Sequence, residues 1–156
     1  MADLAKIESI PTLGLLNGTY GEETPIEWLR IQFGSLNDYA EQGKDISPEQ
    51  MRELCYLVLS GYYYLNLAEI CLFIARFKLG YYGEFYGAIG PMKISAALKQ
   101  YVSERRSDLD IYERKNAIIE RDRLIEERNK NSITHEEYLR RKELGIIGEI
   151  PCQNQK

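Results

Sequence analysis

The sequence predicts an all-α protein. We expect a compact bundle of about four to five helices with a Gly/Tyr-rich loop, followed by a charged helix-turn-helix tail. Two observations predict this fold class. Four segments have the form of a helix-capping box, in which a Ser, Thr or Asn is followed three residues later by Glu or Gln. No segment shows a convincing alternation of apolar and polar residues with the period of a strand.

The first three boxes predict the helices of the globular part. Thr24-Pro25-Ile26-Glu27 carries proline at the expected first helical position, and Ser47-Pro48-Glu49-Gln50 repeats the pattern. Asn66-Leu67-Ala68-Glu69 is the third box, and Gly80 is the expected end of its helix. Apolar residues follow each start at helical spacing. The predicted inward-facing residues are Trp28, Leu29, Phe33, Leu36, Leu54, Cys55, Val58, Leu59, Ile70, Phe73, Ile74 and Phe77.

The segment 80–87 contains three glycines in eight residues and is therefore a poor helix. We expect a structured loop or a short hairpin, called the connector below. Gly90-Pro91 then opens another helix, with Ile94, Ala97, Leu98, Tyr101 and Val102 facing inward.

From Glu104 onward, acidic and basic side chains alternate without Pro or Gly, which is typical of a solvated helix with local ion pairs. Ile111, Ile118 and Ile125 recur every seven residues, but two heptad steps are too few to predict a coiled coil. Thr134-His135-Glu136-Glu137 is the fourth capping box. We therefore predict a globular domain over 1–103, a charged helical hairpin or tail over 104–145, and a frayed end over 146–156.

Composition and cysteine usage limit the expected cellular compartment and the classes of function. Twenty Lys and Arg against 24 Asp and Glu exclude a globally basic nucleic-acid binder. Three cysteines, none in a CxxC pair, favour reduced thiols and a cytoplasmic location. Cys55 and Cys71 are interpreted as buried structural thiols. The N-terminal residues lack the basic segment and following apolar run of a signal peptide, so none is expected. No apolar stretch reaches the length of a membrane span.

The sequence offers no constellation for catalysis. The single histidine, His135, lies in a charged cap, whereas a metal site or a nucleophile-base pair needs several convergent groups. The phosphate-binding and dinucleotide-binding glycine motifs are absent. We expect neither an enzyme nor a metal or other cofactor.

The connector carries the candidate site. Aromatic residues lie between its glycines and basic residues flank it, so it could stack on bases and meet phosphates, or anchor a protein partner. The alternative is that the aromatics only fill a gap between helices, and this packing role is favoured about two to one. The candidate binding residues are Arg76, Lys78, Tyr81, Tyr82, Phe85, Tyr86 and Lys93. The pairs Arg105-Arg106 and Arg140-Arg141 are further candidate phosphate contacts.

The connector also carries a resemblance. The string Phe77-Lys78-x-Gly80-x-Tyr82-Gly83-x-Phe85-Tyr86-Gly87, with Tyr20-Gly21 and Trp28-Leu29 before it, resembles an uncharacterised family of small helical proteins from gut anaerobic bacteria, their phages and mobile elements. Gly90 departs from the family pattern, which has an acidic residue there. Residues 124–144 look like the short C-terminal helical hairpin appended to many bacterial proteins. The resemblance implies no activity.

Two hypotheses follow. The first is a non-enzymatic accessory or adaptor protein in the DNA metabolism or replication of a mobile element or phage. The second is an oligomeric structural or scaffold protein, such as a phage component, assembled through its C-terminal helices. We expect a protein partner or self-association, with nucleic acid as a further option, and neither a membrane nor a small-molecule cofactor.

Overall fold

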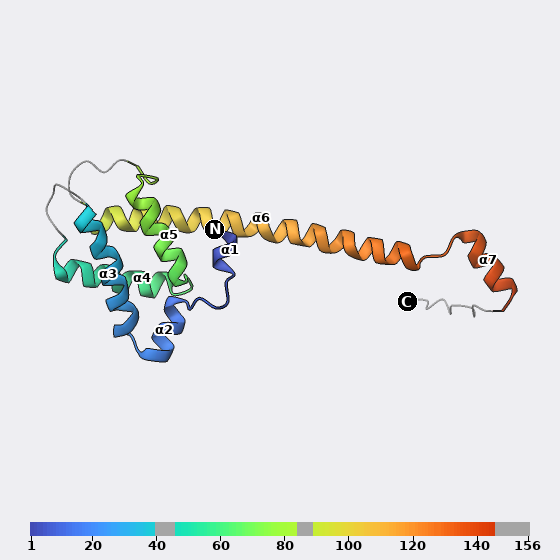
Figure 1. The fold of residues 1–156 in the computed structure, drawn as a ribbon, viewed down its shortest axis with the longest axis horizontal. Coiled ribbons are helices and arrows are strands. Elements are labelled where there is room, and N and C mark those ends of the chain that lie inside the picture. The colour runs from blue at the N-terminus through green and yellow to red at the C-terminus, as the bar shows by residue number, and fades with distance from the viewer. Residues whose placement is uncertain (40–45, 84–88, 146–156) are drawn as a thin grey trace, which may run out of the picture. The chain divides into compact units, whose positions relative to one another are not determined.

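The computed structural model describes residues 1–39, 46–83 and 89–145. These residues form seven helices and no strand, which confirms the all-α prediction (Figure 1). The helices are α1 (Ala2–Ala5), α2 (Leu13–Tyr20), α3 (Glu23–Tyr39), α4 (Pro48–Tyr62), α5 (Leu67–Lys78), α6 (Pro91–Asn131) and α7 (His135–Glu143). Contacts divide the chain into two units, the body (Met1–Tyr112) and the C-terminal unit (Glu113–Lys156).

Two predicted capping boxes are confirmed in full. The Ser47 hydroxyl accepts the Gln50 N–H at 3.3 Å, and the Gln50 side chain accepts the Ser47 N–H at the start of α4. Asn66 and Glu69 exchange the same pair of bonds at 2.9 and 3.1 Å at the start of α5. Each box satisfies two of the N–H groups that a helix start leaves without an intrahelical partner.

The fourth box forms in part. The Thr134 hydroxyl accepts the Glu137 N–H at 3.2 Å and so caps α7 as predicted. The Glu137 carboxylate bonds Arg141 at 2.8 Å instead of turning back to the cap. An arginine one turn further along the helix therefore competes successfully for that carboxylate.

The prediction that Thr24 caps α3 is wrong. Gly21 ends α2 with φ of 84°, and this left-handed turn lets α3 begin at Glu23, one residue before Thr24. The Thr24 hydroxyl donates to the Tyr20 carbonyl at 3.4 Å. Pro25 still lies in the first helical turn, where its missing N–H costs no helical hydrogen bond.

Helix α2 was not expected from the sequence, and its position depends on long-range contacts. The N–H groups of Leu13 and Gly14 donate to the carbonyls of Leu65 and Tyr63 at 2.9 and 2.8 Å. A Cβ on Gly14 would lie 3.2 Å from the Tyr63 carbonyl oxygen, so a glycine permits this approach. The first residues of α2 are thereby fixed against the link between α4 and α5.

The core lies in the body. Phe73 of α5 is at its centre, with ring contacts to Phe33, Phe77 and Tyr101 at centroid distances of 6.5, 5.9 and 5.9 Å. The predicted inward-facing residues are buried in each helix, except that Trp28 and Val102 are half-buried. The first turns of α6 join the same core through Ile94, Ala97, Leu98 and Tyr101.

The two predicted buried thiols differ. Cys55 is fully buried, and burial raises the pKa of its thiol to about 12. Cys71 is exposed, so its predicted burial is wrong. The buried stripe of α5 passes through Ile70, Phe73, Ile74 and Phe77, and a residue directly after Ile70 points about 100° away from it.

Helix α6 continues without a break across residue 103, where the sequence predicts the end of the globular domain, and it ends at Asn131. That domain boundary stays a prediction, whereas contacts divide the chain after Tyr112. The C-terminal unit is described over residues 113–145, apart from the side chain of Asn131. None of these described residues is buried. The predicted frayed end, 146–156, lies outside the described residues.

Candidate interaction site

Helix α5 ends in a hydrogen-bonded C-cap that determines where the connector begins. Gly80 adopts φ of 73°, and its N–H donates to the Phe77 carbonyl at 3.0 Å. The Tyr81 N–H donates back to the Arg76 carbonyl at 3.0 Å. These two bonds form a Schellman motif, which confirms Gly80 as the helix stop. The reversal also returns Tyr81 to the last turn of α5, beside Arg76.

The guanidinium of Arg76 is occupied within the body. It lies 5.0 Å from the centre of the Tyr81 ring and 3.4 Å from a carboxylate oxygen of Glu104 on α6. It also approaches the Met1 sulfur at 3.2 Å. A cation with a carboxylate and an aromatic ring already beside it has less net charge to offer a phosphate. The structure thus brings Arg76 and Tyr81 together, but with an acidic partner that the sequence analysis missed.

Tyr82 belongs to the core. Its ring lies 5.6 Å from that of Phe73 and is half-buried. Burial raises the pKa of the Tyr82 hydroxyl, while the nearby Arg76 guanidinium opposes the shift. For this residue the packing role that the sequence analysis favoured agrees with the contacts. A Tyr82 substitution would therefore change stability as well as the surface.

The remaining candidate residues are not gathered around Arg76. Lys78 lies two residues further along α5, which turns it about 200° away. Its ammonium is 5.7 Å from the Tyr39 ring centre. Lys93 lies exposed in the first turn of α6. Phe85 and Tyr86 lie outside the described residues, so their predicted roles stay predictions.

Three exposed apolar side chains lie in or close to the connector in the sequence, and of these Tyr81 was a predicted candidate whereas Leu79 and Met92 were not. Leu79 is 84% exposed and Met92 is 82% exposed, while Tyr81 is 56% exposed. Large apolar side chains this exposed are unusual when several lie in one short part of the chain. We call these three residues the connector rim. A hydropathy pattern alone could not find Leu79 and Met92, because apolar residues at helix ends are normally assigned to the core.

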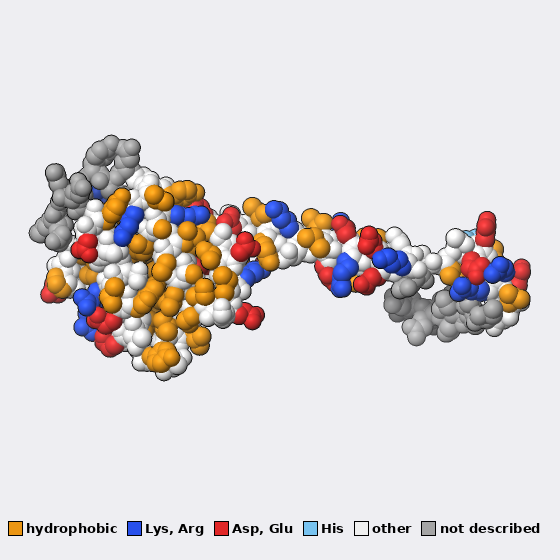
Figure 2. Space-filling view, viewed as in Figure 1, with side chains coloured by type: hydrophobic (Ala, Val, Ile, Leu, Met, Phe, Trp, Pro, Cys, Tyr) orange, Lys and Arg blue, Asp and Glu red, His pale blue; other side chains and the backbone are white. Residues whose placement is uncertain are grey.

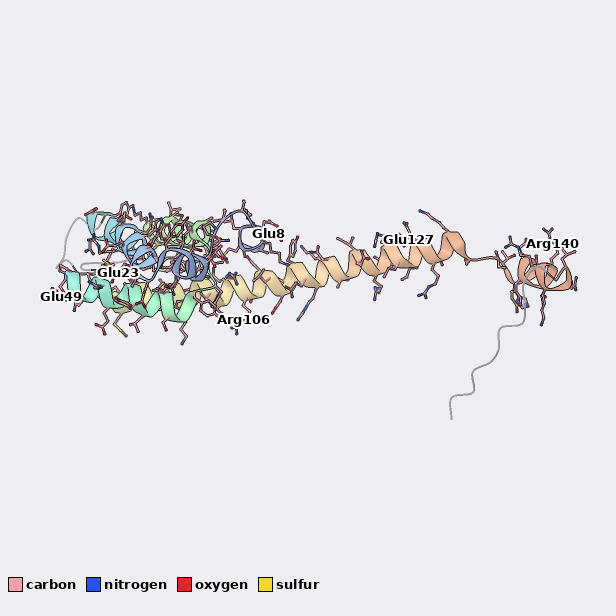
Figure 3. The ribbon with its side chains drawn as sticks, turned by 90° about the horizontal axis from the view of Figure 1, so that it is seen from below. Glu8, Glu23, Glu49, Arg106, Glu127 and Arg140 are labelled. Carbon is pink, nitrogen blue, oxygen red and sulfur yellow. The ribbon has the colours of Figure 1, made fainter. Side chains whose placement is uncertain are left out.

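A second missed feature is a buried ion pair. Glu69 is fully buried, and the Arg105 side chain donates to both its carboxylate oxygens at 2.5 and 3.4 Å. The Arg105 guanidinium also lies 5.4 Å from the Tyr64 ring centre. Arg105 is therefore held by the body, which leaves Arg106 as the exposed member of that predicted phosphate-binding pair (Figure 3). The sequence signal was a glutamate in an otherwise apolar helix, which its cap alone seemed to explain.

Neither a metal-binding cluster nor a helix able to span a membrane occurs in the part of the chain that the structure describes. No group of three or more His, Cys, Asp or Glu side chains there is arranged to hold a metal ion. None of the helices described combines the length and the apolar character needed to cross a bilayer.

The fold and the connector rim define an all-helical protein whose candidate site is suited to binding. The chain belongs to the family of unknown function DUF6633, which matches residues 46–146. That range contains the connector and its flanking helices, so the expectation of an uncharacterised family is confirmed. No curated protein and no solved structure matches the chain.

Proposed function

We propose that this protein is a non-enzymatic accessory or adaptor protein that acts by binding another macromolecule. The observation that carries the proposal is the exposure of the connector rim, because Leu79, Tyr81 and Met92 each leave most of a large apolar side chain in water. Aromatic and apolar anchors of this kind contribute most of the energy in protein interfaces. Lys78 and Lys93 lie next to the rim in the sequence and add positive charge.

The proposed setting is the DNA metabolism or replication of a mobile element or phage of gut anaerobic bacteria. Its support is the resemblance carried by the connector motif and the basic residues on either side of it. Aromatic faces beside cations are a common way to hold single-stranded nucleic acid. Glu104 beside Arg76 weakens that feature, so a protein partner is favoured over DNA.

The experiment separates these partners. A photo-crosslinking residue is placed at position 79 or 92 of the full chain in native cells, and crosslinked proteins are identified. Purified protein is tested in parallel for salt-dependent binding to single- and double-stranded oligonucleotides. We expect a protein crosslink from position 92 that Leu79→Ser reduces, and one from position 79 that Met92→Ser reduces. Leu139→Ser, an exposed change in α7, should leave both unchanged.

DNA binding that falls with salt and with Lys78→Ala or Lys93→Ala, but not with Lys130→Ala, would support the DNA setting directly. A rim that crosslinks to nothing, in a protein that binds no oligonucleotide, would contradict the adaptor proposal. Tyr82→Ala is avoided as a test because that ring packs on Phe73.

The second candidate function is an oligomeric scaffold, and the exposed isoleucines of α6 are the observation in its favour. Ile111, Ile118 and Ile125 are each about half exposed at heptad spacing. A coiled coil needs a second apolar residue three or four positions after each one, and α6 has arginine at 114 and 121 and Lys or Asp at 115 and 122. Light scattering of the full chain tests this candidate. An oligomer that Ile118→Lys and Ile125→Lys convert to a monomer would favour the scaffold.

A further inference from the structure

A groove on the body, separate from the connector rim, lies between α2 and α4. Its volume is about 860 Å³, and it is open to solvent along one face of α4. Most of the lining comes from α4 and its end at helical spacing, and it includes Glu49, Arg52, Glu53, Tyr56, Leu57 and Tyr63. Asn17 of α2 and Glu22 of the α2–α3 turn form the other side. We call this feature the α2–α4 groove.

The groove is apolar at one end. Leu57 is 62% exposed and Tyr63 is 58% exposed, although both lie beside well-packed helices. The close contact of Gly14 with Tyr63 fixes this end of the groove. Exposed apolar side chains in a concave surface lose water favourably when a partner covers them.

The other end of the groove is acidic. Arg52 is the basic residue of the lining, and its guanidinium is bonded to Glu23 at 2.8 Å. The carboxylates of Glu22, Glu49 and Glu53 have no ion-pair partner among the described residues. Figure 2 shows apolar, acidic and basic side chains together on the part of the body that carries α2 to α4. A negative field therefore extends over the groove and would repel phosphates.

The walls of the groove are helices, whose backbone groups are already hydrogen-bonded within each helix. An extended peptide would find no free sheet edge to pair with, and its own backbone would remain unsatisfied. A helix satisfies its backbone internally and presents side chains in a stripe, as helix-in-groove complexes do.

We propose that the α2–α4 groove binds an amphipathic helix of another protein that carries Lys or Arg beside Leu-type residues. The basic side chains face Glu22, Glu49 and Glu53, and the apolar side chains cover Leu57 and Tyr63. This proposal rests on the proposed adaptor function and gives the chemistry of one partner. Opposite charges at the edge of the α2–α4 groove favour association and orientation, while the apolar contact supplies most of the affinity.

The test uses the full chain and a labelled synthetic peptide of about five helical turns, built from Lys and Leu at helical period. A scrambled peptide of the same composition is the control for charge alone. Fluorescence anisotropy gives the dissociation constants at low and high salt. We expect the amphipathic peptide to bind roughly tenfold more tightly than the scrambled one, a ratio that corresponds to about 1.4 kcal/mol.

Matched variants locate the binding. Glu22→Lys with Glu53→Lys, and separately Leu57→Ser, should each weaken binding of the amphipathic peptide by roughly tenfold. Glu8→Lys and Ile31→Ser are exposed changes outside the groove lining and should leave it unchanged. Thermal unfolding of each variant checks that the body stays folded.

Equal binding of both peptides, or equal effects of the groove and control variants, would overturn the proposal. So would light scattering that shows an oligomer of this chain which Leu57→Ser converts to a monomer, because a second copy would then occupy the groove. The adaptor function is judged separately by the crosslinks at the connector rim. Crosslinks at the connector rim without peptide binding would refute the groove proposal alone. Peptide binding in a protein that gives neither rim crosslinks nor oligonucleotide binding would support the groove and contradict the adaptor proposal made from the rim.

Discussion

The two units of this chain use the same arginine–carboxylate chemistry in opposite ways. In the body, Arg105 and Glu69 are 36 residues apart, and the carboxylate is fully buried. In the C-terminal unit, Arg123 bonds Glu120 at 2.6 Å within one turn of α6, with both side chains more than half exposed. A buried pair depends on the surrounding fold, whereas an exposed local pair depends only on its own helix.

The difference concerns how each unit is held together. The body has a core, two complete capping boxes and ion pairs between helices. The described residues of the C-terminal unit bury no side chain, and α7 has nine residues, fewer than the ~12–15 at which isolated helices become even marginally stable. We therefore expect the body to unfold cooperatively and the C-terminal unit to lose its helices gradually.

The largest expected effect is on the body. Arg105→Ala leaves the Glu69 carboxylate buried without its partner, which should lower the free energy of unfolding by about 3–5 kcal/mol. Urea denaturation followed by circular dichroism measures this change. Arg106→Ala removes the same side chain one residue later, where it is exposed, and should change stability by less than about 0.5 kcal/mol.

Equal effects of the two arginine substitutions on the free energy of unfolding would show that the Arg105–Glu69 ion pair does not stabilise the body. The double replacement Arg105→Met with Glu69→Leu sharpens the point. It removes both charges together and should recover part of the lost stability, although it also removes the Glu69 cap of α5.

The next effect is on alkaline stability. Burial holds the pKa of Cys55 near 12, above the unfolded value of 9.0, so the unfolded state loses its proton first as pH rises. The contribution of Cys55 to the free energy of unfolding is constant below about pH 9. It falls by up to about 1.4 kcal/mol per pH unit between pH 9 and 12. Burial raises the pKa of Tyr101 in the same direction.

Comparison of the wild type with Cys55→Ala isolates this alkaline term. The variant is expected to be less stable at neutral pH because it leaves a cavity, but its stability should fall less steeply above pH 9. Parallel slopes for the two proteins would contradict the assignment to Cys55.

Equivalent caps in the two units should differ in their consequences. Ser47→Ala removes the cap of α4 and should lower the free energy of unfolding of the body by about 1 kcal/mol. Thr134→Ala removes the cap of α7 and should leave that cooperative transition unchanged, while lowering the helical signal. If Thr134→Ala shifts the main unfolding transition as much as Ser47→Ala does, the two units unfold together and the contrast between them is contradicted.

The smallest expected effect is that of the local pair. Glu120→Gln removes one exposed contact to Arg123 and should lower the helical signal only slightly, an effect that salt largely hides. Circular dichroism at low and high salt measures it. A loss as large as that of Arg105→Ala would mean that Glu120 lies in an interface.

Local signals in the sequence were sufficient for much of the fold. The boxes at Ser47 and Asn66 and the stop at Gly80 are complete within a few residues, and all three form as predicted. The same rule failed at Thr24, because a glycine three residues earlier allowed α3 to begin sooner. Competing local signals of similar strength are not ranked by pattern alone.

Long-range contacts account for what could not be predicted. Nothing near Glu69 in the sequence indicates Arg105, and nothing near Arg76 indicates Glu104. Helix α2 is fixed by hydrogen bonds to residues about 50 positions away, so its own sequence carries a weak signal. The candidate connector was recognised from its glycines and aromatics, but which of its rings pack and which are exposed follows from the core around Phe73.

Amide hydrogen exchange of the full chain, followed residue by residue, tests the contrast between the two units most directly. The account predicts that core amides of α3, α4 and α5 exchange only by global unfolding, with protection close to the full free energy of unfolding. It predicts that amides of residues 113–145 exchange nearly as fast as in an unfolded peptide. Comparable protection in both units would contradict the account and would indicate that self-association covers the C-terminal helices.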